Sequence, residues 1–239
     1  KDADSQSFRA LDDKQNNFVA SDYALDKHYL YCNGKIVEGA TADNLREIHI
    51  NNNTYLLNDT QVIYDGRVMR GANPGNFGGF EGVSSWTYSV NAGQYLVFSQ
   101  GFPLPAVDRG TFTPLNNSIA KDKQHIFKGQ DQILPGADVA TFELLNDNDF
   151  GKDKYHVYYL ATKLPFAIND ADPDSFKILQ RGYVKDKNHV YVVHLYESVE
   201  KLEKADAASF EATQYDDITK SEARDARHYY YGDKVVGDR

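Results

Sequence analysis

Large apolar residues recur along the chain about every 34 residues, and a residue that favours helix N-termini stands four positions before each. The seven large residues, called anchors here, are Phe8, Leu45, Phe77, Phe112, Phe142, Phe176 and Phe210. The residues four positions earlier are Asp4, Thr41, Asn73, Asp108, Asp138, Asp172 and Asp206. Such residues cap free helix amides, and a second apolar residue three positions after most anchors would share their helix face. The pattern predicts a short capped helical turn at the start of each repeat.

A second motif follows each anchor and consists of an Asp-Lys turn that leads into an aromatic strand, as in Asp-Lys-Asn-His-Val-Tyr at 186–191. The turns begin at Asp26, Asp59, Gly93, Asp122, Asp153, Asp186 and Asp225, and the aromatic residues five positions later are Tyr31, Tyr64, Phe98, Phe127, Tyr158, Tyr191 and Tyr230. A residue-Gly turn follows in all but the fifth and sixth copies. Such turns are typical of hairpins, so each repeat is expected to continue as an antiparallel meander of two or three strands, followed by a return segment such as 35–39.

The anchors divide the chain into seven units, and no change of composition marks a domain boundary. The units are 3–39, 40–71, 72–106, 107–136, 137–170, 171–204 and 205–239, and we predict a single repeat domain over 1–239. A unit of this size cannot bury its own core, so neighbouring units must stack. The expected fold is mainly β, with seven tandem hairpin or meander repeats in an open, curved array. A seven-bladed propeller is the alternative, although the units are short for four-stranded blades.

Charge and cysteine content limit the partners that the protein can have. The 239 residues include 26 Lys and Arg against 35 Asp and Glu, a formal charge of -9. This excess of acid disfavours nucleic acid and favours a cationic protein partner. Cys32 is the only cysteine, so an internal disulfide is excluded. The sequence lacks an apolar run of the length that crosses a membrane, and its start at Lys1 indicates a processed or trimmed chain.

The titratable residues in the motifs favour structural roles over catalysis or metal binding. His125, His156, His189 and His228 recur at one repeat position, but other copies have Tyr29, Val62 and Leu96 there. The alternating Asp170, Asp172 and Asp174 lack the Gly and Glu of a calcium loop. A Gly-x-Ser-x-Gly nucleophile motif is also absent from the sequence. We therefore predict neither catalytic residues nor a cofactor or metal site.

The third unit departs most from the repeat and is the candidate for partner recognition. Five glycines between Gly71 and Gly82 alternate with aromatic residues, and the only tryptophan follows. Glycine gives the backbone freedom, and aromatic side chains give rigid contact area. Phe80, Trp86 and Tyr88 are the predicted partner contacts. The alternative is an irregular repeat whose aromatic side chains pack inward.

The motif copies at 186–191 and 153–159, together with Gly-Ala-Asp at 136–138, resemble the bacterial DKNYY repeat family, and residues 112–206 match best. We assign repeat-structural roles to Asp138, Phe142, Asp172, Phe176, Asp186 and Tyr191. The resemblance implies an exported protein of the periplasm or cell envelope, with a lipid anchor upstream of Lys1 as one form of export. It also implies that such proteins include immunity partners of secreted antibacterial toxins.

The sequence therefore favours a non-catalytic protein that binds a partner, most concretely an immunity protein that neutralises a cationic toxin enzyme by steric occlusion. Two alternatives belong to other classes. One is a structural or scaffold repeat protein of the envelope without a single partner. The other is a glycan-binding or glycan-hydrolysing protein, which would need exposed aromatic residues near carboxylates.

Overall fold

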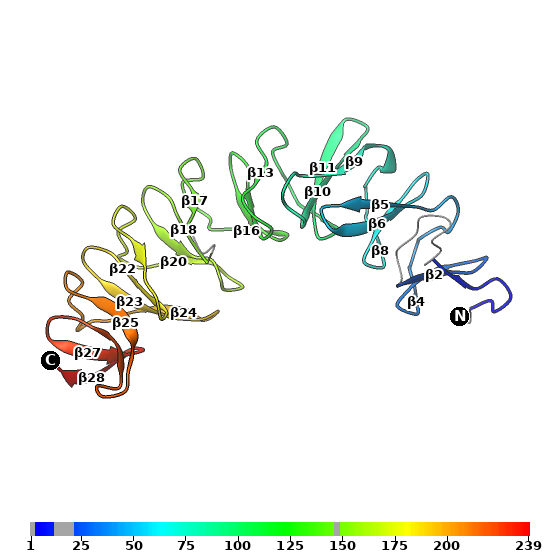
Figure 1. The fold of residues 1–239 in the computed structure, drawn as a ribbon. Helices are drawn as coiled ribbons and strands as arrows, with labels where there is room; N and C mark the ends of the chain where they lie inside the picture. Colours follow the sequence, from blue (N-terminus) through cyan, green and yellow to red (C-terminus); the bar gives the residue numbers. More distant parts are fainter. Residues whose placement is uncertain (1–2, 12–21, 146–148) are drawn as a thin grey trace. The chain divides into compact units, whose positions relative to one another are not determined.

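The computed structural model describes residues 3–11, 22–145 and 149–239, and its regular structure is almost entirely β-strand (Figure 1). The described strands form seven antiparallel sheets of four strands, one sheet for each sequence repeat. The strands lie in chain order across every sheet, so each repeat is a four-stranded meander. Among the described strands, none joins two sheets, and no sheet closes into a barrel. The structure confirms the expected mainly β fold of seven tandem repeats.

The chain divides into two compact units, Lys1–Gln132 and Ile133–Arg239. The N-terminal unit contains the first four sheets, and the last strand of the fourth sheet ends at the boundary. In chain order these sheets contain β1 (Arg9–Ala10), β2 (Tyr23–Leu25), β3 (Leu30–Cys32) and β4 (Lys35–Ile36); β5 (Arg46–Ile50), β6 (Asn53–Leu57), β7 (Val62–Tyr64) and β8 (Arg67–Val68); β9 (Phe77–Gly79), β10 (Trp86–Asn91), β11 (Gln94–Ser99) and β12 (Phe102–Pro103); and β13 (Thr113–Pro114), β14 (Ile119–Lys121), β15 (Ile126–Lys128) and β16 (Asp131–Ile133).

The C-terminal unit contains the other three sheets. They consist of β17 (Glu143–Leu144), β18 (Phe150–Lys152), β19 (Val157–Tyr159) and β20 (Phe166–Ala167); β21 (Lys177–Ile178), β22 (Tyr183–Lys185), β23 (Val190–His194) and β24 (Ser198–Lys201); and β25 (Glu211–Asp216), β26 (Ser221–Arg224), β27 (His228–Tyr231) and β28 (Lys234–Asp238). Each compact unit thus holds several stacked repeats. A single domain over 1–239 stays a prediction.

Each repeat has four strands, and the last of them is the expected return segment. The strand that the sequence did not reveal is the first one, which begins directly after the anchor, or at the anchor itself in the third repeat. In the fifth repeat it is β17, which pairs with β18 only through Glu143 opposite Lys152 and Leu144 opposite Gly151. A strand of two residues is too short to show an alternating pattern in the sequence. The sequence pattern places these residues in the helical turn instead.

The predicted short capped turns are present, each as a single turn. Among the described residues, one 3-10 helix occurs, η2 (Pro74–Asn76), and the Asn73 side chain caps it by accepting the Gly75 amide at 2.9 Å. In the fifth repeat the Thr141 amide lies 3.2 Å from the Asp138 carbonyl and 3.0 Å from its carboxylate. Capping was therefore predicted correctly. The turn ends early because the first strand begins at once.

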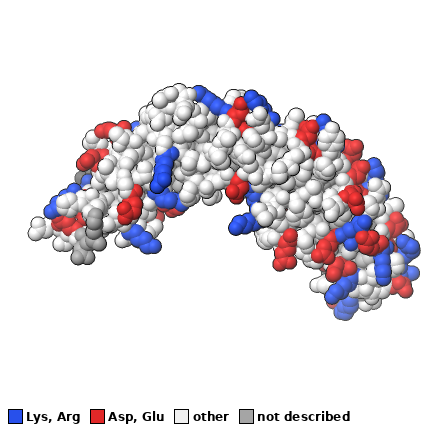
Figure 2. Space-filling view, turned by 180° about the vertical axis from the view of Figure 1, so that it is seen from behind, with Lys and Arg blue, Asp and Glu red and all other residues white. Residues whose placement is uncertain are grey.

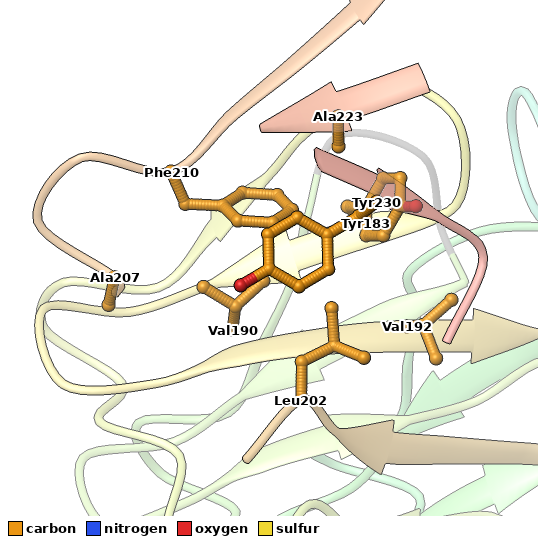
Figure 3. Packing of buried hydrophobic residues seen from close by; sticks show 8 residues of the cluster. All are labelled: Tyr183, Val190, Val192, Leu202, Ala207, Phe210, Ala223 and Tyr230. Carbon is orange, nitrogen blue, oxygen red and sulfur yellow. The ribbon is translucent and has the colours of Figure 1, made fainter. Parts of the chain in front are cut away.

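Within each compact unit, the hydrophobic core lies between consecutive sheets. Between the sixth and seventh sheets, residues of β22 and β23 pack against the next anchor and against β26 and β27 (Figure 3). The rings of Tyr183 and Phe210 have centroids 5.3 Å apart. The residues equivalent to Tyr183 in the earlier repeats are all buried: Tyr23, Tyr55, Trp86, Ile119 and Phe150. Each sheet covers part of the next, which is why the repeats must stack.

Candidate functional site

The aspartate of the Asp-Lys motif forms a buried hydrogen-bonded node, which Asp153 shows in full. One carboxylate oxygen accepts the backbone amides of Tyr155 and His156 at 2.7 and 2.8 Å. The other accepts the Asp138 amide and the Tyr158 hydroxyl, both at 2.7 Å. The node thus joins the capped turn, the Asp-Lys turn and the aromatic strand of one repeat. We call this arrangement the aspartate node.

The same node recurs in four other repeats, around Asp26, Asp122, Asp186 and Asp225. Each accepts the amide of its capping residue at 2.8 to 2.9 Å, from Asp4, Asp108, Asp172 or Asp206. The Tyr191 hydroxyl lies 3.4 Å from Asp186, a longer contact than in the fifth repeat. The fourth repeat has Phe127 at this position, and its His125 ring nitrogen lies 3.4 Å from Asp122. The motif is therefore a structural clasp.

The capping residues complete the clasp. The Asp172 carboxylate accepts the Ser175 amide at 2.9 Å and the Lys187 ammonium at 2.7 Å. The Lys187 backbone amide in turn donates to the Ser175 hydroxyl at 3.0 Å. Lysine after the node aspartate thus binds the capped turn through both its backbone and its side chain. In the seventh repeat Ala226 keeps only the backbone bond, to Ser209.

The predicted anchors fill the space beside these clasps. Phe142 is buried, and its ring lies 2.8 Å from where a Cβ on Gly151 would stand, so glycine is required there. Phe176 is half-buried and packs on Phe150 of the preceding sheet, with ring centroids 5.6 Å apart. Both side chains therefore lie in the repeat core.

The predicted node residue of the second motif was wrong in the second and third repeats, although Phe98 does occupy the aromatic position of the third. In the second, Asn58 is the buried residue of the turn, and its side-chain oxygen accepts the Thr60 and Gln61 amides at 2.9 and 2.7 Å. Asp59 is exposed and binds the Asn44 side chain instead. The side-chain oxygen of Asn58 takes the place of the carboxylate oxygen. The sequence pattern requires an aspartate, so it places the turn one residue too late, at Asp59. Ile63 therefore takes the place of Tyr191, because it lies opposite Leu56 in the sheet.

In the third repeat, buried Ser89 replaces the node aspartate and accepts the Asn73 amide at 2.7 Å. Gly93 lies four residues further on, in the turn between β10 and β11. The hairpin of β10 and β11 is longer than in the other repeats, so the node residue no longer lies in the turn itself. The node residue could therefore not be located from the spacing in the sequence.

Hydrogen bonds and burial together lower the pKa of a node aspartate and raise the pKa of a node tyrosine, as Asp225 and Tyr31 show. Burial alone would raise the pKa of Asp225, but the amides of Asp206 and Arg227, the Tyr230 hydroxyl and the His228 amide lower it to about 2. Burial, followed by the bond to Asp26, raises the pKa of Tyr31 to about 12. The carboxylate therefore stays ionised and the phenol stays protonated, which suits a permanent hydrogen bond.

The three predicted partner contacts of the third repeat lie in or against the core. Trp86 is 0% exposed and donates its ring N–H to the Asn116 carbonyl at 2.8 Å. Phe80 is half-buried, with its ring 5.4 Å from that of Phe112. Tyr88 lies over Gly78 and stacks on Tyr95. Burial corrects the expectation for Trp86, which cannot touch a partner in the folded protein; Phe80 and Tyr88 as contacts stay predictions.

The candidate metal ligands are also tied into the repeat. His156 and His228 lie beside the node tyrosines, with ring nitrogens 3.4 and 3.3 Å from the hydroxyls of Tyr158 and Tyr230. Within the described ranges, no group of three His, Cys, Asp or Glu side chains is arranged to hold a metal ion. The run Asp147-Asn148-Asp149 before Gly151 is a second stretch of the sequence with oxygen ligands, too few for a calcium loop, and its first two residues lie outside the described residues.

A feature that the sequence analysis missed is a group of exposed apolar side chains on the C-terminal unit. Leu164, Leu195, Tyr196, Ile218 and Tyr231 are 80, 67, 73, 92 and 51% exposed. Four of them lie in loops or turns between paired strands of the last three sheets, and Tyr231 is the last residue of β27, next to the turn into β28. We call these five residues the apolar loop edge. The missing residue-Gly turns of the fifth and sixth repeats were the signal in the sequence, because longer loops replace them there.

Cavities offer a weaker candidate site. An open groove of about 750 Å³ lies beside β17 and β21, where Leu144, Phe176 and Ile178 form its apolar wall. Glu143 and Lys177 line it as well, and Glu143 lies 3.5 Å from the Lys152 ammonium. The lining offers apolar contact and charge, and no pair of carboxylates faces across it in the described residues.

Charged side chains of both signs lie interspersed on the face shown in Figure 2. Asp and Glu outnumber Lys and Arg by 20 to 14 over residues 133–239. In the part of the chain that the structure describes, we find no helix of the length and apolarity needed to cross a bilayer.

Comparisons with known proteins identify the family. Residues 1–162 match the model of the DKNYY family, which is more than half of the chain. The motif copy at 186–191 lies outside this match, so the segment expected to match best, 112–206, is covered only in part. Searches of curated proteins and of solved structures found no match. The aspartate nodes give the family's repeated motif a structural explanation, and the chain belongs to the DKNYY family.

Proposed function

We propose that this protein is a non-catalytic binding protein of the bacterial envelope, most concretely an immunity protein that neutralises a secreted antibacterial toxin by steric occlusion. The apolar loop edge is the observation that carries the proposal. Leucine and isoleucine side chains exposed by two thirds or more cost solvation free energy unless a partner covers them. Such a surface fits a protein partner.

The chemistry of the buried carboxylates supports the same function. In the five aspartate nodes the carboxylate oxygens accept amides of the chain. In four of them, around Asp26, Asp122, Asp153 and Asp225, these hydrogen bonds lower the pKa of the carboxyl group despite its burial. These hydrogen bonds fix the capped turn and the Asp-Lys turn of each repeat relative to each other. A rigid scaffold that presents loops is the arrangement by which many binding proteins work.

Aliphatic residues at the loop edge favour a protein partner over a glycan. Sugar rings stack on aromatic faces, whereas Leu164, Leu195 and Ile218 are among the most exposed residues of the loop edge. The acidic excess of the chain would speed its encounter with a cationic toxin. Once bound, the repeats would block access of the substrate to the toxin's active site.

Affinity capture from the bacterium that produces the protein tests this function. The immobilised chain is expected to retain one stoichiometric partner that an unrelated acidic protein of equal charge does not retain. If the partner is a toxin enzyme, an equimolar amount of the chain should abolish its activity. Recovery of no stoichiometric partner, or full partner activity in the complex, would contradict the proposal and favour a scaffold.

A further inference from the structure

The residues of the apolar loop edge lie at the same end of their sheets. In a four-stranded meander, the connections between strands one and two and between strands three and four lie at one end. Leu164 lies between β19 and β20, Leu195 and Tyr196 between β23 and β24, Ile218 between β25 and β26, and Tyr231 at the β27–β28 turn. The aspartate nodes occupy the opposite end, where strands two and three connect.

Hydrogen bonds between repeats hold this edge together. The Tyr196 amide donates to the Tyr159 hydroxyl of the preceding repeat at 3.1 Å. The Tyr183 hydroxyl donates to the Gly232 carbonyl of the following repeat at 3.0 Å. The loops are therefore fixed before a partner arrives, which lowers the entropic cost of binding.

Unpaired carboxylates accompany the apolar side chains. Glu197 follows Tyr196 directly, Asp233 stands two residues after Tyr231, and both are exposed. Neither forms an ion pair with another described residue. Asp217, next to Ile218, lies 3.5 Å from the Lys220 ammonium. Lys163 and Lys234 are exposed at the same edge, but acidic residues outnumber basic ones by 20 to 14 over 133–239. The charge of this unit therefore favours a partner whose apolar surface is surrounded by cations.

We propose that the apolar loop edge docks into an apolar cleft of a basic protein whose cations pair with Glu197 and Asp233. The inference rests on the proposed function and names the surface and the partner's chemistry. A bilayer suits the edge less well, because short carboxylates beside the protruding side chains cannot reach back to water as lysine does. Anionic lipids would also repel them. A second copy of this acidic chain is also disfavoured, because two chains of the same negative charge repel each other.

Site-specific photo-crosslinking in the producing cells tests this assignment. The photoreactive p-benzoylphenylalanine replaces Tyr196 in one variant, Tyr231 in a second and Tyr155 in a third. Tyr155 is the matched control, because it is 62% exposed but lies in the Asp153 turn at the opposite end. We expect one basic protein to be crosslinked from positions 196 and 231 and not from 155. The double substitution Glu197→Lys and Asp233→Lys should lower its yield about tenfold.

Other outcomes would overturn the inference, and they separate it from the proposed function. Equal crosslinking from all three positions, or from 155 alone, would place the contact elsewhere while a partner still exists. A second copy as the crosslinked protein would overturn the partner's chemistry. Tyr196-dependent binding to vesicles of phosphatidylglycerol and phosphatidylethanolamine would favour a bilayer. Failure of the proposed function would appear separately, as capture of no stoichiometric partner by the unmodified chain.

Discussion

Each node aspartate satisfies several donors at once, so its loss should cost more than the loss of any one donor. In Asp153→Ala, the amides of Asp138, Tyr155 and His156 lose their acceptor. We expect the free energy of unfolding to fall by about 3 kcal/mol, because buried unsatisfied donors are expensive. Tyr158→Phe removes one donor and should cost about 1 kcal/mol. The fourth repeat already has a phenylalanine, Phe127, at this position. Urea unfolding followed by circular dichroism measures both, and equal losses would contradict the node.

The depressed pKa of the node aspartate Asp225 predicts the direction of acid sensitivity. Asp225 has its folded pKa lowered to about 2, below the ordinary value of about 3.9 of an unfolded chain. Its contribution is therefore complete above about pH 4 and is lost as the pH falls toward 2. The urea midpoint should drop over this range. Asp225→Asn should flatten the drop, and a midpoint independent of pH between 5 and 2 would refute the linkage.

At the scale of strands and sheets, Trp86 is predicted to stabilise the core between the third and fourth sheets. It packs with Val97, Phe112 and Phe127 and is fully buried. Trp86→Ala should lower the free energy of unfolding by about 3 to 5 kcal/mol. Tyr196→Ala, at the exposed loop edge, should change it by less than about 0.5 kcal/mol. A comparison of the two urea unfolding curves tests this, and similar stability of the variants would show that Trp86 is not a core residue.

A lysine at the end of a strand links the sixth repeat to the seventh. The Lys185 ammonium donates to the carbonyls of Ala207 and Phe210 at 2.6 and 3.1 Å. Lys185→Met should cost about 1.5 to 3 kcal/mol of unfolding free energy, since it removes charge-assisted bonds. Lys187→Met is the matched control, because it breaks only the exposed pair with Asp172 and should have little effect. Calorimetric unfolding that ranks the two variants in the opposite order would contradict this link.

The sequence was sufficient to locate residues that recur at a constant distance from one another. It was insufficient where a residue of a different type accepts the hydrogen bonds of the node aspartate. Each anchor follows its cap by four residues, and each aromatic residue follows its node aspartate by five, so the anchors and five aspartate nodes could be located although the distance from cap to node varies from 14 to 22 residues. Asn58 and Ser89 accept equivalent bonds without a carboxylate, so the motif moved out of register there. First strands of two residues left no periodic signal.

The candidate binding surface could not be predicted because exposure depends on stacking. Aromatic residues of the third repeat suggested recognition, yet stacked sheets bury Trp86. Loops of the fifth to seventh repeats contain ordinary Leu, Ile and Tyr residues, which a sequence pattern would assign to a core. Only the meander shows that they lie at the end of the sheets, beyond the reach of neighbouring strands.

In the whole molecule, the residues of the structural interior differ from those of the proposed binding edge. Aspartate nodes and inter-sheet aromatic residues stabilise the repeats, while the apolar loop edge of the C-terminal unit is the proposed contact with the partner. The two sets of residues do not overlap. A change at the edge should therefore alter affinity without altering stability, and a change in the nodes should do the reverse.

Titration calorimetry with the captured partner tests this separation most directly. The double substitution Leu195→Ser and Tyr196→Ser should weaken binding about 100-fold, since buried apolar and aromatic contacts dominate interface energies. The Tyr155→Ser control should bind as the unmodified chain does. Both variants should unfold at the urea midpoint of the unmodified chain. Unchanged affinity of the loop-edge variant, with its fold intact, would contradict the account.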